Sequence, residues 1–211
     1  GSIRKIVIST KVTSTLISGL ADVLGITSDG TNLYITDKGD HIVEKVVISS
    51  LQRSTIAGTG SLGSSDHTTG TLASFDEPRG ITTDGTNLYV ADYENHKIRK
   101  IVISTGAVST LAGSGTASST DNTDGTLATF NNPAGITTDG TNLYVTEYTG
   151  RKVRKIVISS GVVTTIAGSG DQGSQDHTTG ISATFNGPWG ITTDGTYLYV
   201  TGDGNLIRRI E

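Results

Sequence analysis

Histidines in two matching loops are the first residues in this sequence that could do chemistry. His67 and His177 each stand in the motif Asp-His-Thr-Thr-Gly, and imidazole nitrogens from two such loops could share a zinc ion. No HxH or HExxH spacing is present, however, and equivalent residues of different repeats need not converge. We therefore interpret them as surface-loop histidines and predict no metal site and no cofactor.

Acidic and hydroxyl side chains give weaker signals. The segment Asp121–Gly125 is similar to a calcium-binding loop but lacks the bidentate acid that closes one. Serine and threonine are abundant, yet no GxSxG motif or Ser/His/Asp arrangement is identifiable, and the chain has no cysteine. These patterns predict that the chain is not an enzyme.

An internal repeat defines the elements that would position any functional residue. The sequence Gly-Ile-Thr-Ser-Asp-Gly-Thr-Asn-Leu-Tyr-Ile-Thr begins at Gly25, and near-copies begin at glycines 80, 135 and 190, a constant spacing of 55 residues. The repeat units start near residues 20, 75, 130 and 185. A repeat of this length is typical of a propeller, in which each unit is one blade.

Each repeat contains four short strand-like segments. In the second repeat we expect them at 80–83, 87–91, 98–103 and 108–112. The Asp84-Gly85 pair between the first two is a hairpin signal, because such turns need positive φ. Apolar residues on both faces of the second strand indicate that blades cover both sides. We predict an all-β fold, a β-propeller of four-stranded antiparallel blades forming a single domain over residues 1–211.

Arginines of the third strand have a structural interpretation. Arg99 and Arg154 follow Asp92 and Glu147 at the same spacing, so each pair could bridge the second and third strands of its blade.

Positions that differ among the repeats are the candidates for binding, since blade geometry does not dictate them. The residue before the first glycine of each unit is Leu24, Arg79, Ala134 or Trp189, and the loops after the second strand vary as well. Aromatic and arginine side chains are the usual anchors of binding sites. An alternative is that Trp189 only plugs the narrow channel. The predicted ligand-binding set is Arg79, Trp189, Tyr93, Tyr148, His96 and Arg151.

The run from Phe130 to Glu147, Phe-Asn-Asn-Pro-Ala-Gly-Ile-Thr-Thr-Asp-Gly-Thr-Asn-Leu-Tyr-Val-Thr-Glu, followed by Lys-Val-Arg-Lys-Ile at 152–156, resembles the NHL repeat. The Gly-rich loops resemble bacterial extracellular members of that family. The resemblance implies a propeller and an extracellular or cell-surface location. Some related lyases and hydrolases hold a metal in a six-bladed cavity, but no counterpart of their ligand set is recognisable here.

The order of strands raises the question of how the ring closes. The chain starts with a third and a fourth strand (residues 3–17) and ends after a short third strand at 207–210. We expect four blades, the last completed by the N-terminal strands. The alternative is a larger ring formed by two chains that exchange ends, so the chain would be a monomer or such a dimer. Both terminal segments are candidates for the same third-strand position.

Composition narrows the function classes. A net charge of −4 with dispersed Arg and Lys predicts no nucleic-acid binding, and the apolar runs are too short for membrane insertion. We predict a binding or scaffold module that presents loops to a protein or glycan partner. A metal-dependent lyase- or hydrolase-like enzyme is one alternative. Another is an engineered or excised repeat fragment without activity, which the Gly1-Ser2 start allows.

Overall fold

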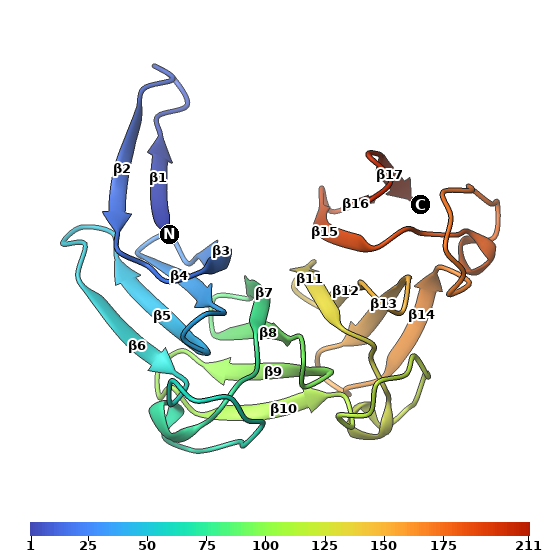
Figure 1. The fold of residues 1–211 in the computed structure, drawn as a ribbon, viewed down its shortest axis with the longest axis horizontal. Helices are drawn as coiled ribbons and strands as arrows, with labels where there is room; N and C mark the ends of the chain where they lie inside the picture. The colour runs from blue at the N-terminus through green and yellow to red at the C-terminus, as the bar shows by residue number, and fades with distance from the viewer.

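The computed structural model describes residues 1–211 and consists almost entirely of β-strands, arranged as an open arc of blades (Figure 1). The only helical elements are three short 3-10 turns, η1 (Gly70–Leu72), η2 (Gly125–Leu127) and η3 (Gly180–Ser182). The predicted all-β propeller with four antiparallel blades is confirmed. No helix is long and apolar enough to cross a membrane.

The strands form antiparallel sheets in chain order. Blade I consists of β3 (Val23–Ser28), β4 (Asn32–Asp37), β5 (Ile42–Val47) and β6 (Arg53–Ala57). Blade II consists of β7 (Pro78–Thr83), β8 (Asn87–Asp92), β9 (Lys97–Val102) and β10 (Val108–Ala112). Blade III consists of β11 (Pro133–Thr138), β12 (Asn142–Glu147), β13 (Lys152–Val157) and β14 (Val163–Ala167). Blade IV has three strands, β15 (Pro188–Thr193), β16 (Leu198–Gly202) and β17 (Ile207–Ile210), and the N-terminal hairpin pairs β1 (Ser2–Ile6) with β2 (Thr13–Ser18).

The Asp-Gly turns between the first two strands of each blade are as predicted. In blade III, Gly140 has φ 88°, and Asp139 Oδ1 accepts hydrogen bonds from the backbone N–H of Thr141 (2.8 Å) and Asn142 (2.6 Å). The second carboxylate oxygen accepts from Asn142 Nδ2 and from the Tyr144 hydroxyl, both at 2.9 Å. Each turn is therefore closed by its own aspartate, which explains why the motif repeats so closely.

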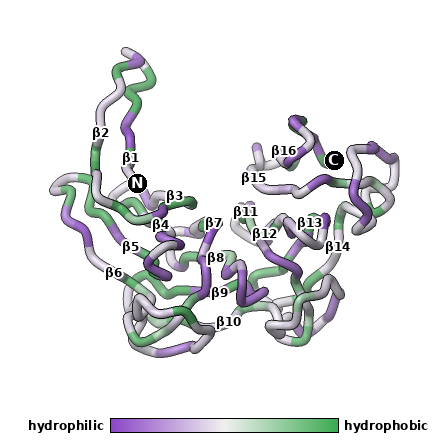
Figure 2. Tube along the Cα trace, viewed as in Figure 1, coloured by the Kyte–Doolittle hydropathy of each residue, from purple (hydrophilic) through white to green (hydrophobic).

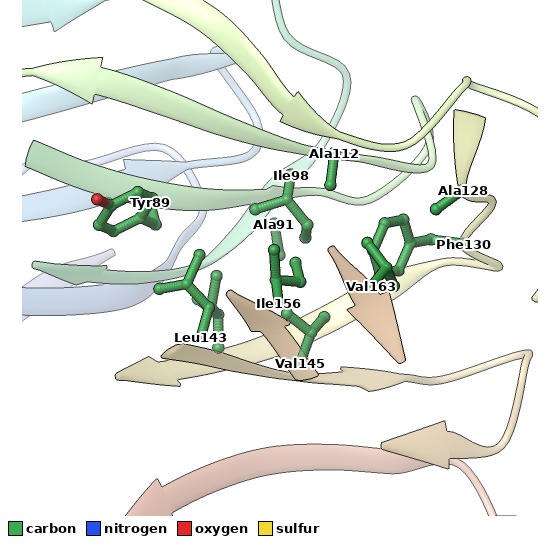
Figure 3. Close-up of a cluster of buried hydrophobic side chains, with 11 residues drawn as sticks. Tyr89, Ala91, Ile98, Ala112, Ala128, Phe130, Leu143, Val145, Ile156 and Val163 are labelled. Atoms are coloured by element: carbon green, nitrogen blue, oxygen red, sulfur yellow. The ribbon is translucent and has the colours of Figure 1, made fainter. Parts of the chain in front are cut away.

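The hydrophobic core lies between successive blades. The cluster joining blades II and III includes Ile98, Phe130, Leu143 and Ile156, all fully buried (Figure 3). In blade II, Ile101 of the third strand packs toward the preceding blade and Ile98 toward the following blade. Apolar residues on both faces of a strand are thus both buried, as the sequence pattern predicted.

A buried ion pair crosses the middle strands of two blades. Arg99 Nη1 lies 2.7 Å from Asp92 Oδ2, and Arg154 Nη1 lies 3.1 Å from Glu147 Oε1, with all four side chains inaccessible to solvent. Each guanidinium also stacks on a phenylalanine ring, Phe75 in the first case. The pairing predicted from their matched spacing is confirmed, and it has a structural role.

Glycines allow the innermost strands to approach closely. A Cβ built on Gly80 would lie 2.5 Å from the Ala134 carbonyl oxygen, and one on Gly135 would lie 2.2 Å from that of Trp189. The repeated glycine of the first strand is therefore required by the neighbouring blade's backbone. The residue just before it consequently lies beside the equivalent residue of the next blade.

The expected completion of the last blade by the N-terminal strands is not formed within the chain. Strand β17 pairs with β16, so it already occupies the third-strand position of blade IV. The hairpin packs instead against blade I, where Ile3 and Ile17 join Ile35 and Val46 in a buried cluster. Figure 1 shows the hairpin and blade IV on opposite sides of the opening of the arc.

Candidate functional site

Two inner strands and two loops bring four predicted binding residues together. Arg79 lies on β7 and Trp189 on β15, each at the position before the strand's glycine. Tyr93 and Tyr148 follow the second strands of blades II and III. We call these four residues the Arg79 cluster.

The centre of the cluster is a stacked arginine. The guanidinium carbon of Arg79 lies 3.2 Å from the centroid of the Tyr93 ring and 4.9 Å from that of Trp189. Both distances are within the range of cation–π attraction. Arg79 Nη2 also donates to Glu77 Oε2 at 2.8 Å, which fixes the far side of the guanidinium. Its Nε is buried without a protein partner.

Trp189 extends the cluster to blade III. Its ring meets that of Tyr148 edge to face, with centroids 5.3 Å apart and an interplanar angle of 88°. The Tyr148 hydroxyl donates to Asp203 Oδ2 at 2.8 Å, and this hydrogen bond raises the pKa of Tyr148. Trp189 remains 40% exposed, so its ring is not fully enclosed by the chain.

Ala134 makes this arrangement possible. It occupies the blade III position that corresponds to Arg79 in blade II and Trp189 in blade IV, and it is buried. A larger side chain there would compete with the space through which Arg79 approaches the Trp189 ring. The contact between Arg79 of blade II and Trp189 of blade IV therefore depends on the small residue Ala134 in blade III.

A hollow of about 200 Å³ adjoins the cluster. Arg151, another predicted binding residue, lines it together with Tyr148. The other lining residues supply mainly polar groups: Thr149, Gln172, Asn186, Gly187 and Asp203. The side of the site next to Tyr148 can therefore offer a ligand both hydrogen-bond donors and acceptors.

His96 is held by a different set of contacts. Its Nδ1 accepts a hydrogen bond from the Asn132 N–H at 3.1 Å, and the equivalent His41 accepts one from the Glu77 N–H at 3.2 Å. Both histidines have positive φ, 54° and 53°. The repeated contact links blade I to blade II and blade II to blade III, and it gives His96 a structural role beside the proposed site.

Two acidic residues of the site were not singled out in the sequence. Asp203 occupies the loop position of Tyr148 one repeat later, so the repeat alignment itself carried a signal for it. Glu77 has no comparable signal, because its role depends on the position of the Arg79 side chain.

The histidines of the matching loops fold back on their own loops. The Thr69 N–H donates to His67 Nδ1 at 2.9 Å, and the Thr179 N–H donates to His177 Nδ1 at 3.0 Å. No group of three or more His, Asp or Glu side chains is arranged to hold a metal ion.

Comparison with known proteins confirms the repeat type. Residues 75–101 match the NHL repeat model. The human NHL repeat-containing protein 2 is 36% identical to this chain over 92 residues, which cover 42% of the chain and 13% of that protein. The chain thus spans only a small part of the curated relatives it matches.

Solved structures show the same fold. An auxiliary nutrient binding protein from Bacteroides thetaiotaomicron matches with a TM-score of 0.72 and 19% identity, covering 96% of this chain and 51% of that one. A chain of the nidogen/laminin complex matches with a TM-score of 0.60 and 16% identity, covering 97% and 81%.

Proposed function

We propose that this chain is a non-enzymatic binding module that recognises a protein or glycan partner through the Arg79 cluster. The observation that carries the proposal is the exposed Trp189 ring, held between the Arg79 guanidinium and Tyr148. A large aromatic side chain that is rigidly supported and open to solvent is typical of a binding hot spot.

The chemistry of the site suits an amphipathic ligand. The indole offers a flat apolar surface, while Asp203 and Arg151, in the hollow beside Tyr148, supply charged hydrogen-bonding groups. Sugar rings present a C–H face and hydroxyl groups, and peptides present apolar side chains and amides, so both match this pairing. The fixed position of Arg79 reduces the entropy lost on binding.

The structural neighbours support the same function class. One is named as a nutrient binding protein and another comes from a complex between two proteins, nidogen and laminin. By analogy we propose an extracellular or cell-surface location for this chain. The propeller fold alone hosts many activities, so the proposal rests on the residues of the site.

The test measures binding without tryptophan fluorescence, because Trp189→Ala removes the only tryptophan of the chain. The purified chain is applied to a glycan microarray and to an array of extracellular-matrix proteins, and positive probes are then titrated by isothermal titration calorimetry. We expect Trp189→Ala to abolish the response of every true ligand, and the matched change Tyr197→Ala on the distant β15–β16 turn to preserve it. Equal affinity of the Trp189→Ala variant would overturn the proposal.

A further inference from the structure

The two ends of the arc expose side chains whose equivalents in blade II are buried. Ile101 of blade II is fully buried between blades, whereas the equivalent Ile6 of the N-terminal hairpin is 64% exposed. Ile81 of β7 is 6% exposed, whereas the equivalent Ile26 of β3 is 52% exposed. Figure 2 shows hydrophobic segments along the hairpin and on β3. This end of the arc therefore lacks a preceding blade.

The other end lacks a following blade. Ile207 of β17 is 76% exposed, whereas the equivalent Ile98 is fully buried. Gly190, unlike Gly80 and Gly135, has no carbonyl of a further inner strand within 4 Å of its Cβ position. Each end thus exposes one of the two surfaces that meet wherever two successive blades pack together.

Blade IV also has an empty position for a fourth strand. A groove of about 530 Å³ runs beside β17, and its lining includes Asp176, His177, Phe185 and Arg208. In blade II the equivalent space holds β10, whose Thr110 donates its backbone N–H to Asp66 at 2.9 Å. Asp176, the equivalent of Asp66, lines the groove and has no fourth strand beside it.

The high exposure of Asp176 indicates that blade IV lacks the strand that covers the equivalent aspartates. Asp66 and Asp121 have 43% and 47% exposed side chains, but Asp176 is 91% exposed. His177 also corresponds to His67, whose backbone exchanges two hydrogen bonds with Val108 of β10 (3.2 and 2.9 Å). A fourth strand in the groove would supply the hydrogen-bond partners that β10 supplies to Asp66 and to the backbone of His67.

The N-terminal hairpin has the sequence and register of that strand pair. In β2, Ser14-Thr15-Leu16 is identical to Ser109-Thr110-Leu111 of β10. Ile6 pairs with Thr13 as Ile101 pairs with Val108, and both ladders shift register at the same place. Strand β1 likewise matches β17, Ile-Arg-Lys-Ile against Ile-Arg-Arg-Ile.

We propose that two copies of this chain close one ring, the hairpin β1–β2 of each copy completing blade IV of the other. The hairpin enters as a unit and takes the place of β17 beside β16, because the edge of β2 that faces the third strand in a complete blade is already paired with β1. Arg4 of the second copy then replaces Arg208 against Asp176, Thr15 donates to Asp176, and Thr13 pairs with His177. Ile26 packs against the completed blade.

The number of copies follows from the blade count. Each chain contributes four blades, so two chains make eight, the upper end of the usual range for propellers. Three chains would make twelve, which lies beyond it. One chain would have to bring blade IV to its own hairpin, and Figure 1 shows the two on opposite sides of the opening of the arc.

The first test is the mass of the 211-residue chain in solution by light scattering. We expect a dimer of about twice 21.9 kDa. The double variant Ile6→Asp/Ile26→Glu should be monomeric, because both side chains would be buried at the junction. Leu127→Asp, which changes an equally exposed residue (62%) away from the ends, should leave the dimer intact. A monomeric or larger wild-type species would overturn the proposal.

The second test distinguishes exchange from closure within one chain. Hydrogen-bonded residues of antiparallel strands have Cα atoms about 5.5 Å apart, which permits a disulfide. The chain has no cysteine, so Thr13→Cys/His177→Cys introduces a single possible pair. We expect a covalent dimer after oxidation, whereas a disulfide within one chain would overturn the proposal. Deletion of residues 206–211 should preserve the dimer, and its loss would contradict replacement of β17.

Discussion

Arg79 and Trp189 are 110 residues apart in sequence, yet the guanidinium carbon lies 4.9 Å from the centroid of the indole ring. The contact spans blade III without involving a long side chain from it, because the intervening inner-strand residue is Ala134. The repeat thus determines the positions of Arg79 and Trp189, and the small size of Ala134 allows their side chains to come into contact.

Trp189→Ala should leave the fold largely intact. The side chain is 40% exposed, so we expect the free energy of unfolding to fall by about 1 kcal/mol, well below the 3–5 kcal/mol that removal of a buried tryptophan costs. Chemical denaturation of both proteins provides the comparison. Quenching of wild-type tryptophan fluorescence by iodide should be measurable, and an unquenched, blue-shifted spectrum would contradict the exposed placement.

Ala134→Leu should separate Arg79 from Trp189. The residue is buried, and the three added carbon atoms cost about 1–3 kcal/mol through overpacking. We expect a change in the Trp189 emission maximum and loss of ligand binding while the β-sheet circular dichroism is retained. Ala134→Ser, which adds one oxygen atom, is the control. If Ala134→Leu binds as the wild type does, the space next to Arg79 has no role in the site.

The sequence repeat was sufficient to predict the blades, the Asp-Gly turns and the Arg99–Asp92 ion pair, because each depends on contacts within one repeat. It also led to the choice of Arg79, Tyr93, Tyr148 and Trp189 as binding candidates, since they depart from the repeated frame, and the structure brings these four together. The contact across Ala134 depends on the distance between three blades, which no local pattern encodes.

Completion of the last blade within one chain was predicted incorrectly for a similar reason. Counting strands shows that β2 could serve as a fourth strand, but it does not reveal the curvature of the arc. The two segments competing for the third-strand position were recognised, and the structure places β17 there. The link between His96 and Asn132 also escaped prediction, because positive φ at a histidine has no signal in a single sequence.

Arg99→Ala should destabilise the chain strongly. Asp92 is fully buried, and removal of its partner leaves a charge in the core, which costs about 3–5 kcal/mol. Burial already raises the pKa of Asp92 to about 6 against the opposing effect of Arg99, so the variant should be less destabilised at pH 5 than at pH 8. Denaturation of Lys100→Ala, at the neighbouring half-buried position, supplies the control. Equal stability of the two variants would contradict a structural role for the pair.

Acid stability should depend on the aspartates of the Asp-Gly turns. Burial of Asp139 opposes its ionisation, but hydrogen bonds from Asn142, Thr141 and Tyr144 outweigh it and lower the pKa from 3.8 to about 2. A depressed carboxyl pKa stabilises the folded chain above the unfolded value of 3.8, and this contribution is lost as the pH falls toward 2.

Asp139→Asn removes that contribution at one turn. We expect the difference in melting temperature between wild type and Asp139→Asn to be constant above about pH 5 and to shrink between pH 4 and pH 2, because the wild-type carboxylate becomes protonated in that interval. Differential scanning calorimetry across this range measures it. Asp171→Asn, at an exposed loop position, should show no such convergence. A difference that persists unchanged to pH 2 would mean that the ionised carboxylate does not stabilise the turn.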